Sequence, residues 1–231
     1  MIISSKDRVL IVAAHPDDEI LGCGGFLSKY SNTVEFSVIF IAEGDSCRFD
    51  NPNLTPQVLK KIKFRESCAR KALSLFKVTD IDFHNLPCGR LDTIDIIEIN
   101  KIIEKKIMSF KPTILLSHYS NDINNDHRII ARSVEMASRP VPGFDFNVFS
   151  FEILSSTEWN LKDPFNPNFF IQLSEEDVKN KIEAIKIYDG EVRKFPHSRS
   201  AKGVKYLSHY RGMQIGATFA EAFYANRINI I

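Results

Sequence analysis

Residues 9–25 read VLIVAAHPDDEILGCGG and give the clearest indication of how the chain folds. A run of apolar and β-branched residues leads directly into a histidine, two aspartates and a glutamate, and then into a helical pattern. Such a run is typical of a buried parallel strand, and its polar continuation marks the carboxyl end of that strand. Ligands bind at this edge of open α/β sheets, so the sequence places a functional site here.

Beyond this stretch, apolar runs and amphipathic segments alternate along the chain. Further strand-like runs are VEFSVIFIA, IDFHNL and TILLSH, at 34–42, 81–86 and 113–118. Helical periodicity covers roughly 18–30, 56–76, 94–110 and 127–138. This order predicts an α/β fold: a three-layer, mostly parallel, Rossmann-like sheet with helices on both faces.

The length of 231 residues suits a single α/β domain, and we expect one domain over 1–231. Region 139–173 is rich in Pro, Phe and Asn and lacks a long periodic stretch. We expect loops and short antiparallel strands there, shaping the substrate pocket. We expect a final helix near 174–188, because Ser174 and Asp177 form a variant of the helix-start box.

Composition gives no indication of nucleic acid or membrane as a partner. Hydrophobic residues make up 44%, charged residues 26%, and the formal charge is +1. The N-terminal apolar run is too short to span a membrane and carries no signal-peptide cleavage pattern. The four cysteines lie far apart without a CxxC pair, which is typical of reduced thiols in a cytoplasmic protein.

The first strand end carries residues suited to a catalytic zinc ion. His15 and Asp18 can both turn inward from the strand-to-helix turn, offering one nitrogen and one oxygen ligand. Asp17 is then left beside the metal. The alternative is that Asp17 and Asp18 cap the following helix through its dipole. A histidine between a buried strand and two acids is hard to explain by capping alone, so we favour the metal site.

A second polar cluster, SHYSNDINNDHRII at 117–130, follows the fourth predicted strand. His127 supplies a third ligand there and leaves the fourth position for water, as catalytic zinc sites require. Asp126 either caps the helix or orients an imidazole. His118 is interpreted as a hydrogen-bonded core histidine. Zinc is the first choice of metal, although iron, cobalt or nickel would also suit such ligands.

AHPDDEILGCGG at 14–25, together with DINNDHR at 122–128, resembles the LmbE-like or PIG-L-like family of zinc-dependent N-deacetylases. The resemblance implies hydrolysis of the acetamide of an N-acetylated amino sugar or sugar conjugate by a zinc-activated water. It implies His15, Asp18 and His127 as zinc ligands and Asp17 as the general base. It also makes a homo-oligomer plausible.

Three further segments look like family landmarks: FRESCARKA (64–72), LPCGRLD (86–92) and FPHSRS (195–200). The resemblance implies that Arg65 contacts the substrate and that His197 is catalytic, helping to stabilise the oxyanion. Two positions depart from the family pattern. Cys88 stands where many relatives have an acid, and Asn124, expected on the substrate side, stands where several have a histidine.

Other functions remain open at this point. The metal machinery could act on another acyl group or on a non-sugar amine. Cys88 and Asn124 would favour a non-catalytic, metal-bearing binding protein. A nucleotide-binding module is disfavoured, because GCGG at 22–25 is not GxGxxG and because Asp17 and Asp18 would repel a pyrophosphate.

Overall fold

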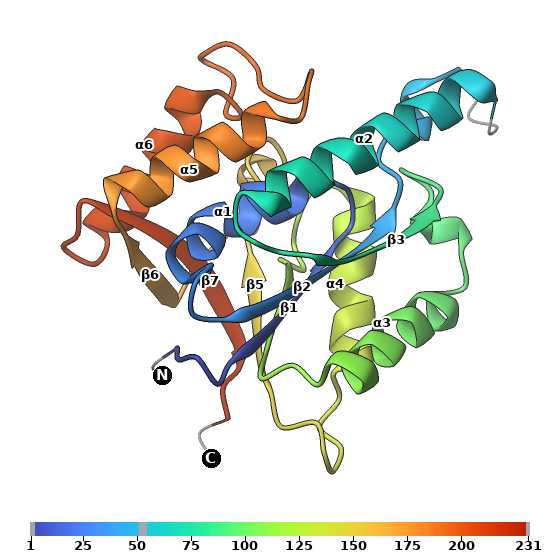
Figure 1. Ribbon diagram of the computed structural model, residues 1–231, viewed down its shortest axis with the longest axis horizontal. Helices are drawn as coiled ribbons and strands as arrows, with labels where there is room; N and C mark the ends of the chain where they lie inside the picture. Colours follow the sequence, from blue (N-terminus) through green and yellow to red (C-terminus); the bar gives the residue numbers. More distant parts are fainter. Residues whose placement is uncertain (1–2, 51–54, 230–231) are drawn as a thin grey trace.

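The computed structural model describes residues 3–50 and 55–229, which form a mostly parallel sheet covered by helices (Figure 1). Within these ranges the seven strands are β1 (Arg8–Ala13), β2 (Glu35–Ala42), β3 (Asp80–Leu86), β4 (Ile114–His118), β5 (Asn147–Phe151), β6 (Phe169–Leu173) and β7 (Phe219–Arg227). Their spatial order is β3-β2-β1-β4-β5-β7-β6, and the first five of these are parallel. β7 runs antiparallel to both of its neighbours.

Helices cover both faces of the sheet (Figure 1). They are α1 (Asp18–Tyr30), α2 (Pro56–Ser74), α3 (Ile96–Phe110), α4 (Asn125–Ala137), α5 (Glu175–Lys186) and α6 (Ala201–Met213), with short 3₁₀ turns η1 (Ser46–Arg48), η2 (Leu91–Thr93) and η3 (Thr157–Trp159). Within the described part of the chain, no helix is both long and apolar enough to cross a membrane.

The strand sequences explain the two hydrophobic cores. On β1, Val9 and Ile11 face the core beneath α1, α2 and α5, whereas Leu10 and Val12 face the core beneath α3 and α4. Because neighbouring side chains on a strand point to opposite faces, a strand buried on both sides must be apolar at every position. The predicted three-layer α/β fold is therefore confirmed, and the four strand-like runs correspond to β1 to β4.

One expectation about the second half of the chain is wrong, and another holds only in part. The helix at 175–186 is not the final element, because α6 and β7 follow it. α6 lacks an apolar stripe, since Ser208, Arg211 and Gly212 are among its buried residues. Region 139–173 does contain short strands, but β5 pairs parallel with β4 as well as antiparallel with β7.

The glycines of α1 permit close packing. A Cβ atom at Gly24 would lie 2.7 Å from Lys181 Cγ, and one at Gly25 would lie 2.4 Å from Leu173 Cδ1. Side chains at these positions would therefore push α1 away from α5 and β6. The GCGG stretch serves helix packing in this fold.

A buried ion pair fixes α1, α5 and β7 to one another. Lys181 Nζ on α5 lies 2.6 Å from Glu221 Oε1 on β7, and it also donates to the carbonyl oxygen of Leu21 at 2.7 Å. Glu221 in turn accepts the backbone N–H groups of Gly25 at 3.0 Å and Phe26 at 2.7 Å. Removing one partner of the pair would leave a buried charge unpaired.

Replacing Lys181 with alanine should lower the free energy of unfolding by about 3–5 kcal/mol, because Glu221 would remain buried without its counter-charge. Urea-induced unfolding followed by circular dichroism measures the change. Lys179→Ala removes an exposed lysine from the same helix and should change stability by less than about 1 kcal/mol. Equal effects of the two substitutions would show that the buried pair has no special role in stability.

Candidate metal centre and active site

The residues predicted as metal ligands meet at the carboxyl edge of the sheet. His15 lies in the turn between β1 and α1, Asp18 is the first residue of α1, and His127 lies in the first turn of α4. All three are buried. β1 and β4 are adjacent parallel strands, so the segments that follow them come together at one point.

The spacing of these three residues fits a small divalent cation. Asp18 Oδ2 lies 3.3 Å from His15 Nδ1 and 3.3 Å from His127 Nε2. Ligand atoms at two corners of a tetrahedron with metal bonds of about 2.0–2.1 Å are about 3.3–3.4 Å apart. Among the described residues, Asp18 Oδ1 and His127 Nε2 are buried without a hydrogen-bond partner. These unpartnered atoms and the nitrogen and oxygen donors fit zinc.

The electrostatics of the group favour positive charge at this point. Burial alone would raise the pKa of Asp18, but the charge of His127 and hydrogen bonds from His127 and His15 hold it well below its usual range. Burial alone would lower the imidazole pKa values, but hydrogen bonds to Asp126 and Asp18 raise that of His15 to about 10. The charge of Asp18 and a hydrogen bond to Asp122 raise that of His127 to about 9.

Asp126 and Asp122 each contact the ring nitrogen of one histidine that does not face Asp18. His15 Nε2 donates to Asp126 Oδ2 at 2.9 Å, which leaves His15 Nδ1 facing Asp18. His127 Nδ1 lies 3.3 Å from Asp122 Oδ1, which leaves His127 Nε2 facing Asp18. Carboxylates placed in this way fix the tautomer and orientation of metal-binding imidazoles.

Of the two roles considered for Asp126, the structure supports the orienting one. Asn124, not Asp126, caps α4, because its side-chain oxygen accepts the backbone N–H of Asp126 at 2.9 Å. Asp126 also accepts the N–H groups of Gly89 at 2.6 Å and Leu91 at 3.2 Å. The side chain of Asn124 therefore has a structural task, and its contact with a substrate stays a prediction.

His118 lies close to the group but is engaged elsewhere. Its Nε2 accepts the backbone N–H of Ala14 at 2.8 Å, and its ring stacks on His127 with centroids 4.1 Å apart. Burial, together with the charge of His127, lowers the pKa of His118 to about 3. These contacts agree with its interpretation as a core histidine.

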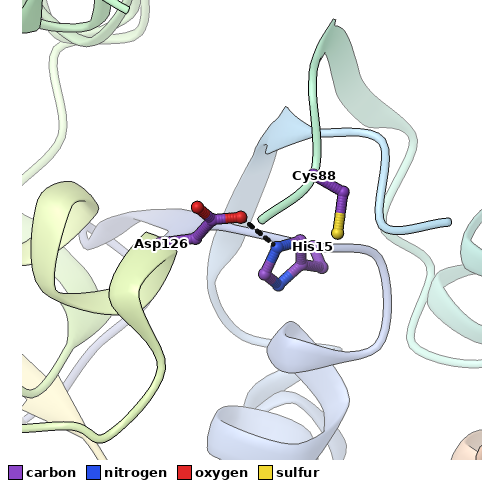
Figure 2. A group of neighbouring side chains, drawn as sticks. All are labelled: His15, Cys88 and Asp126. Carbon is purple, nitrogen blue, oxygen red and sulfur yellow. Dashed lines mark hydrogen bonds and ion pairs between the residues drawn. The ribbon is translucent and has the colours of Figure 1, made fainter. Parts of the chain in front are cut away.

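A second group of possible ligands shares His15. Figure 2 shows His15, Cys88 and Asp126, whose ligand atoms lie within 4.8 Å of one another. In this group His15 Nε2 already donates to Asp126, and both oxygens of Asp126 accept backbone N–H groups. The group of His15, Asp18 and His127 has unpartnered atoms and is the better candidate for a cation.

Asp17 lies beside this candidate cation site in a strained turn. Its backbone has φ 126°, a region that residues other than glycine rarely adopt. The turn is held because Asp17 N–H donates to Glu19 Oε2 at 2.9 Å, and Tyr188 O–H donates to Glu19 Oε1. Burial raises the pKa of Glu19 to about 8.

The carboxylate of Asp17 is paired with two arginines. Its Oδ2 lies 3.0 Å from Arg65 Nη2 and 2.8 Å from Arg199 Nη1. Burial raises the pKa of Asp17, although the charges of Arg65 and Arg199 oppose that shift. Glu191 bridges the two arginines, at 2.7 Å from Arg65 Nη1 and 3.0 Å from Arg199 Nη1. Three charged side chains therefore position Asp17.

Sequence interpretation finds only part of this network. Arg65 reaches the site from α2, as the family resemblance implies, but its guanidinium is engaged by Asp17 and Glu191. In the segment FPHSRS the resemblance points to His197, whereas Arg199 is the residue that contacts Asp17. His197 Nδ1 accepts the backbone N–H of Arg199 at 3.1 Å. Arg199 and Glu191 escape sequence reasoning, because no local pattern joins two loop residues to a distant turn.

Residues 10–138, more than half of the chain, match the sequence model of a family described as PIG-L: GlcNAc-PI de-N-acetylase. Solved structures of other proteins share the fold, among them three with TM-scores of 0.72 to 0.76. A conserved protein from Thermus thermophilus has a TM-score of 0.72 at 21% identity, over 97% of each chain. N,N'-diacetylchitobiose deacetylase from Pyrococcus horikoshii has a TM-score of 0.72 at 18% identity, over 95% of this chain and 83% of its own. 4-Carboxy-2-hydroxymuconate hydratase from Pseudomonas putida has a TM-score of 0.76 at 17% identity, over 97% and 98%.

Substituting His127 with alanine should abolish stoichiometric zinc binding, because the site would keep only two of its three protein ligands. Metal content after dialysis, measured by mass spectrometry, gives the readout. His84→Ala, which removes an exposed histidine on β3, is the matched control and should retain the metal. Unchanged zinc content in the His127 variant would refute the ligand assignment.

Substituting Asp126 with asparagine should weaken zinc binding by about 10- to 100-fold, because His15 would lose the carboxylate that orients its ring. Competition with a fluorescent chelator measures the affinity. Asp92→Asn, at an exposed position in η2, should leave it unchanged. An unaltered affinity in the Asp126 variant would argue that His15 is not held for a metal.

Proposed function

The chain belongs to the PIG-L family, and we propose that it is a zinc-dependent N-deacetylase that releases acetate from an N-acetylated amino sugar or sugar conjugate. The observation that carries the proposal is the group of His15, Asp18 and His127, with unpartnered buried atoms, beside the buried carboxylate of Asp17. Another divalent transition metal would suit the same donors.

The solved structures that share the fold do not all belong to deacetylases. The structural neighbour from Pyrococcus horikoshii is a diacetylchitobiose deacetylase, whereas the neighbour from Pseudomonas putida is a hydratase. One fold can therefore carry different chemistry, and function must be argued from the site. Here the family and the grouping of donors favour deacetylation.

An amide is a poor electrophile, so hydrolysis needs an activated water and a polarised carbonyl. A zinc ion held by His15, Asp18 and His127 would lower the pKa of a water to about 7 and polarise the carbonyl oxygen. The protein's remaining tasks are to move protons, to position the amide and to stabilise developing charge.

Asp17 is the proposed general base. Arg65 and Arg199 fix the direction of its carboxylate, and burial favours the protonated form. A carboxylate under these two influences can take a proton from the attacking water and return it to the departing amine. Arg65 would then act as a positioning residue for Asp17, in addition to the substrate contact that the resemblance implies.

His197 and Asn124 complete the proposed site. His197 Nδ1 accepts a backbone N–H, so Nε2 is the nitrogen that could donate to an oxyanion. Asn124 Oδ1 caps α4, so its amide nitrogen is the group that could reach a substrate. Both residues are proposed to contact substrate atoms, and neither is proposed as a metal ligand.

The proposal predicts acetate release from at least one N-acetylated sugar in a panel of free and nucleotide-linked donors, and loss of that release with a chelator. Asp17→Asn should retain zinc but reduce turnover by about 10²- to 10⁴-fold, because the proton acceptor is lost. Enzymatic detection of acetate provides the rates, and Asp92→Asn is the matched control.

Three other results would each redirect the assignment. Near-normal turnover in the Asp17 variant would remove Asp17 as the base. Release of a different acyl group, or release only from non-sugar amines, would identify a related amidohydrolase. A zinc-loaded protein inactive on every amide would favour a metal-bearing binding protein.

A further inference from the structure

Two cysteines that are distant in sequence meet next to the candidate metal centre. Cys47 lies in η1 after β2, and Cys88 lies in the loop after β3. Their Sγ atoms are 3.2 Å apart, and both cysteines are free. Because β2 and β3 are adjacent parallel strands, the segments after them leave the same edge of the sheet. Both thiols are reduced, as expected, but their approach is not evident from the sequence, because the two residues are 41 positions apart.

One buried carboxylate holds both cysteine-bearing segments in place. Glu43 Oε1 accepts the backbone N–H of Cys88 at 2.8 Å. Glu43 Oε2 accepts the backbone N–H groups of Asp45 at 2.6 Å and Ser46 at 2.9 Å, directly before Cys47. The approach of the two sulfur atoms is therefore fixed by the main chain and does not depend on side-chain rotation alone.

The two thiols have different environments. Cys47 is exposed, and a hydrogen bond from Cys88 lowers its pKa to about 7, against the effect of burial. Cys88 is buried, and the same hydrogen bond, together with burial, raises its pKa. An exposed sulfur 3.2 Å from a buried one is the arrangement in which the accessible sulfur reacts first and the buried one follows.

We propose that Cys47 and Cys88 form an oxidation site that a hydroperoxide converts into an intramolecular disulfide. The Cys47 thiolate attacks the hydroperoxide, the O–O bond breaks, and Cys47 becomes a sulfenic acid while an alkoxide or hydroxide leaves. The Cys88 sulfur then attacks Cys47 sulfur, forming the S–S bond and releasing water. Overall, two thiols and one hydroperoxide give one disulfide, one alcohol or water, and one further water.

This oxidation site adjoins the metal centre. Cys88 Sγ lies within 4.8 Å of ligand atoms of His15 and Asp126 (Figure 2). The next residue, Gly89, donates its N–H to Asp126 at 2.6 Å. A disulfide would therefore tie η1 to the loop that holds Asp126. The proposal stands apart from the deacetylase assignment, because it concerns thiol chemistry alone.

Disulfide mapping of the zinc-loaded protein tests the proposal. About one equivalent of hydrogen peroxide should remove two free thiols per chain, and a non-reducing digest should give a peptide linking Cys47 to Cys88. Cys68→Ala, which removes a buried cysteine on α2, should still form the link. Cys88→Ser should accumulate a sulfenic acid at Cys47 that dimedone traps, and Cys47→Ser should block both reactions.

The wild-type digest keeps the test decisive even if a variant folds poorly. Absence of the linked peptide, or a link between Cys47 residues of two chains, would overturn the proposal. So would thiols that react only after a chelator has removed the metal, because Cys47 and Cys88 would then be metal ligands.

Discussion

The site depends on one buried carboxylate surrounded by imidazoles. Asp18 Oδ2 lies within 3.5 Å of nitrogen atoms of His15, His118 and His127. A carboxylate removed from water is costly unless positive groups compensate it, and His15 and His127, whose pKa values are raised, are those groups here. Two outer acids, Asp122 and Asp126, hold two of these imidazoles in turn. Carboxylates and imidazoles therefore alternate across the site, with Asp18 at its centre. A bound cation would complete the neutralisation of the Asp18 carboxylate.

The parallel sheet makes this arrangement possible. Adjacent parallel strands β1 and β4 end side by side, so the turn before α1 and the start of α4 meet without any long excursion of the chain. α1 must then lie close to β6 and α5, which the glycines at Gly24 and Gly25 permit. The ion pair of Lys181 and Glu221 secures this helix. The packing of α1 against α5, β6 and β7 therefore holds the helix at whose start Asp17 and Asp18 lie.

Sequence alone predicts the parts of the protein in which chemistry and local pattern coincide. β1 to β4 stand out as apolar runs, and the polar residues after β1 and β4 mark one edge of a sheet. α6 and β7 escape prediction because Ser208, Arg211 and Glu221 are buried at positions where an apolar residue would reveal the pattern. No spacing in the sequence identifies residues that come into contact only in the folded chain.

Residues in loops are the clearest examples of contacts that the sequence does not predict. Arg199 and Glu191 approach Asp17 from the segment between α5 and α6, and the printed sequence links neither to the first strand end. Cys47 and Cys88 also meet in the folded chain, although they are 41 positions apart in sequence. Such contacts become visible only when the order of the strands and the paths of their connections are known.

Metal binding by His15, Asp18 and His127 is the assignment on which the proposed function rests. The most direct test is a crystal structure of the zinc-loaded protein with anomalous diffraction recorded at the zinc absorption edge. With zinc bound by these residues, a peak should lie about 2.0–2.2 Å from His15 Nδ1, an Asp18 carboxylate oxygen and His127 Nε2. A peak between His15 Nε2, Cys88 Sγ and Asp126, or no peak at this edge of the sheet, would contradict the assignment.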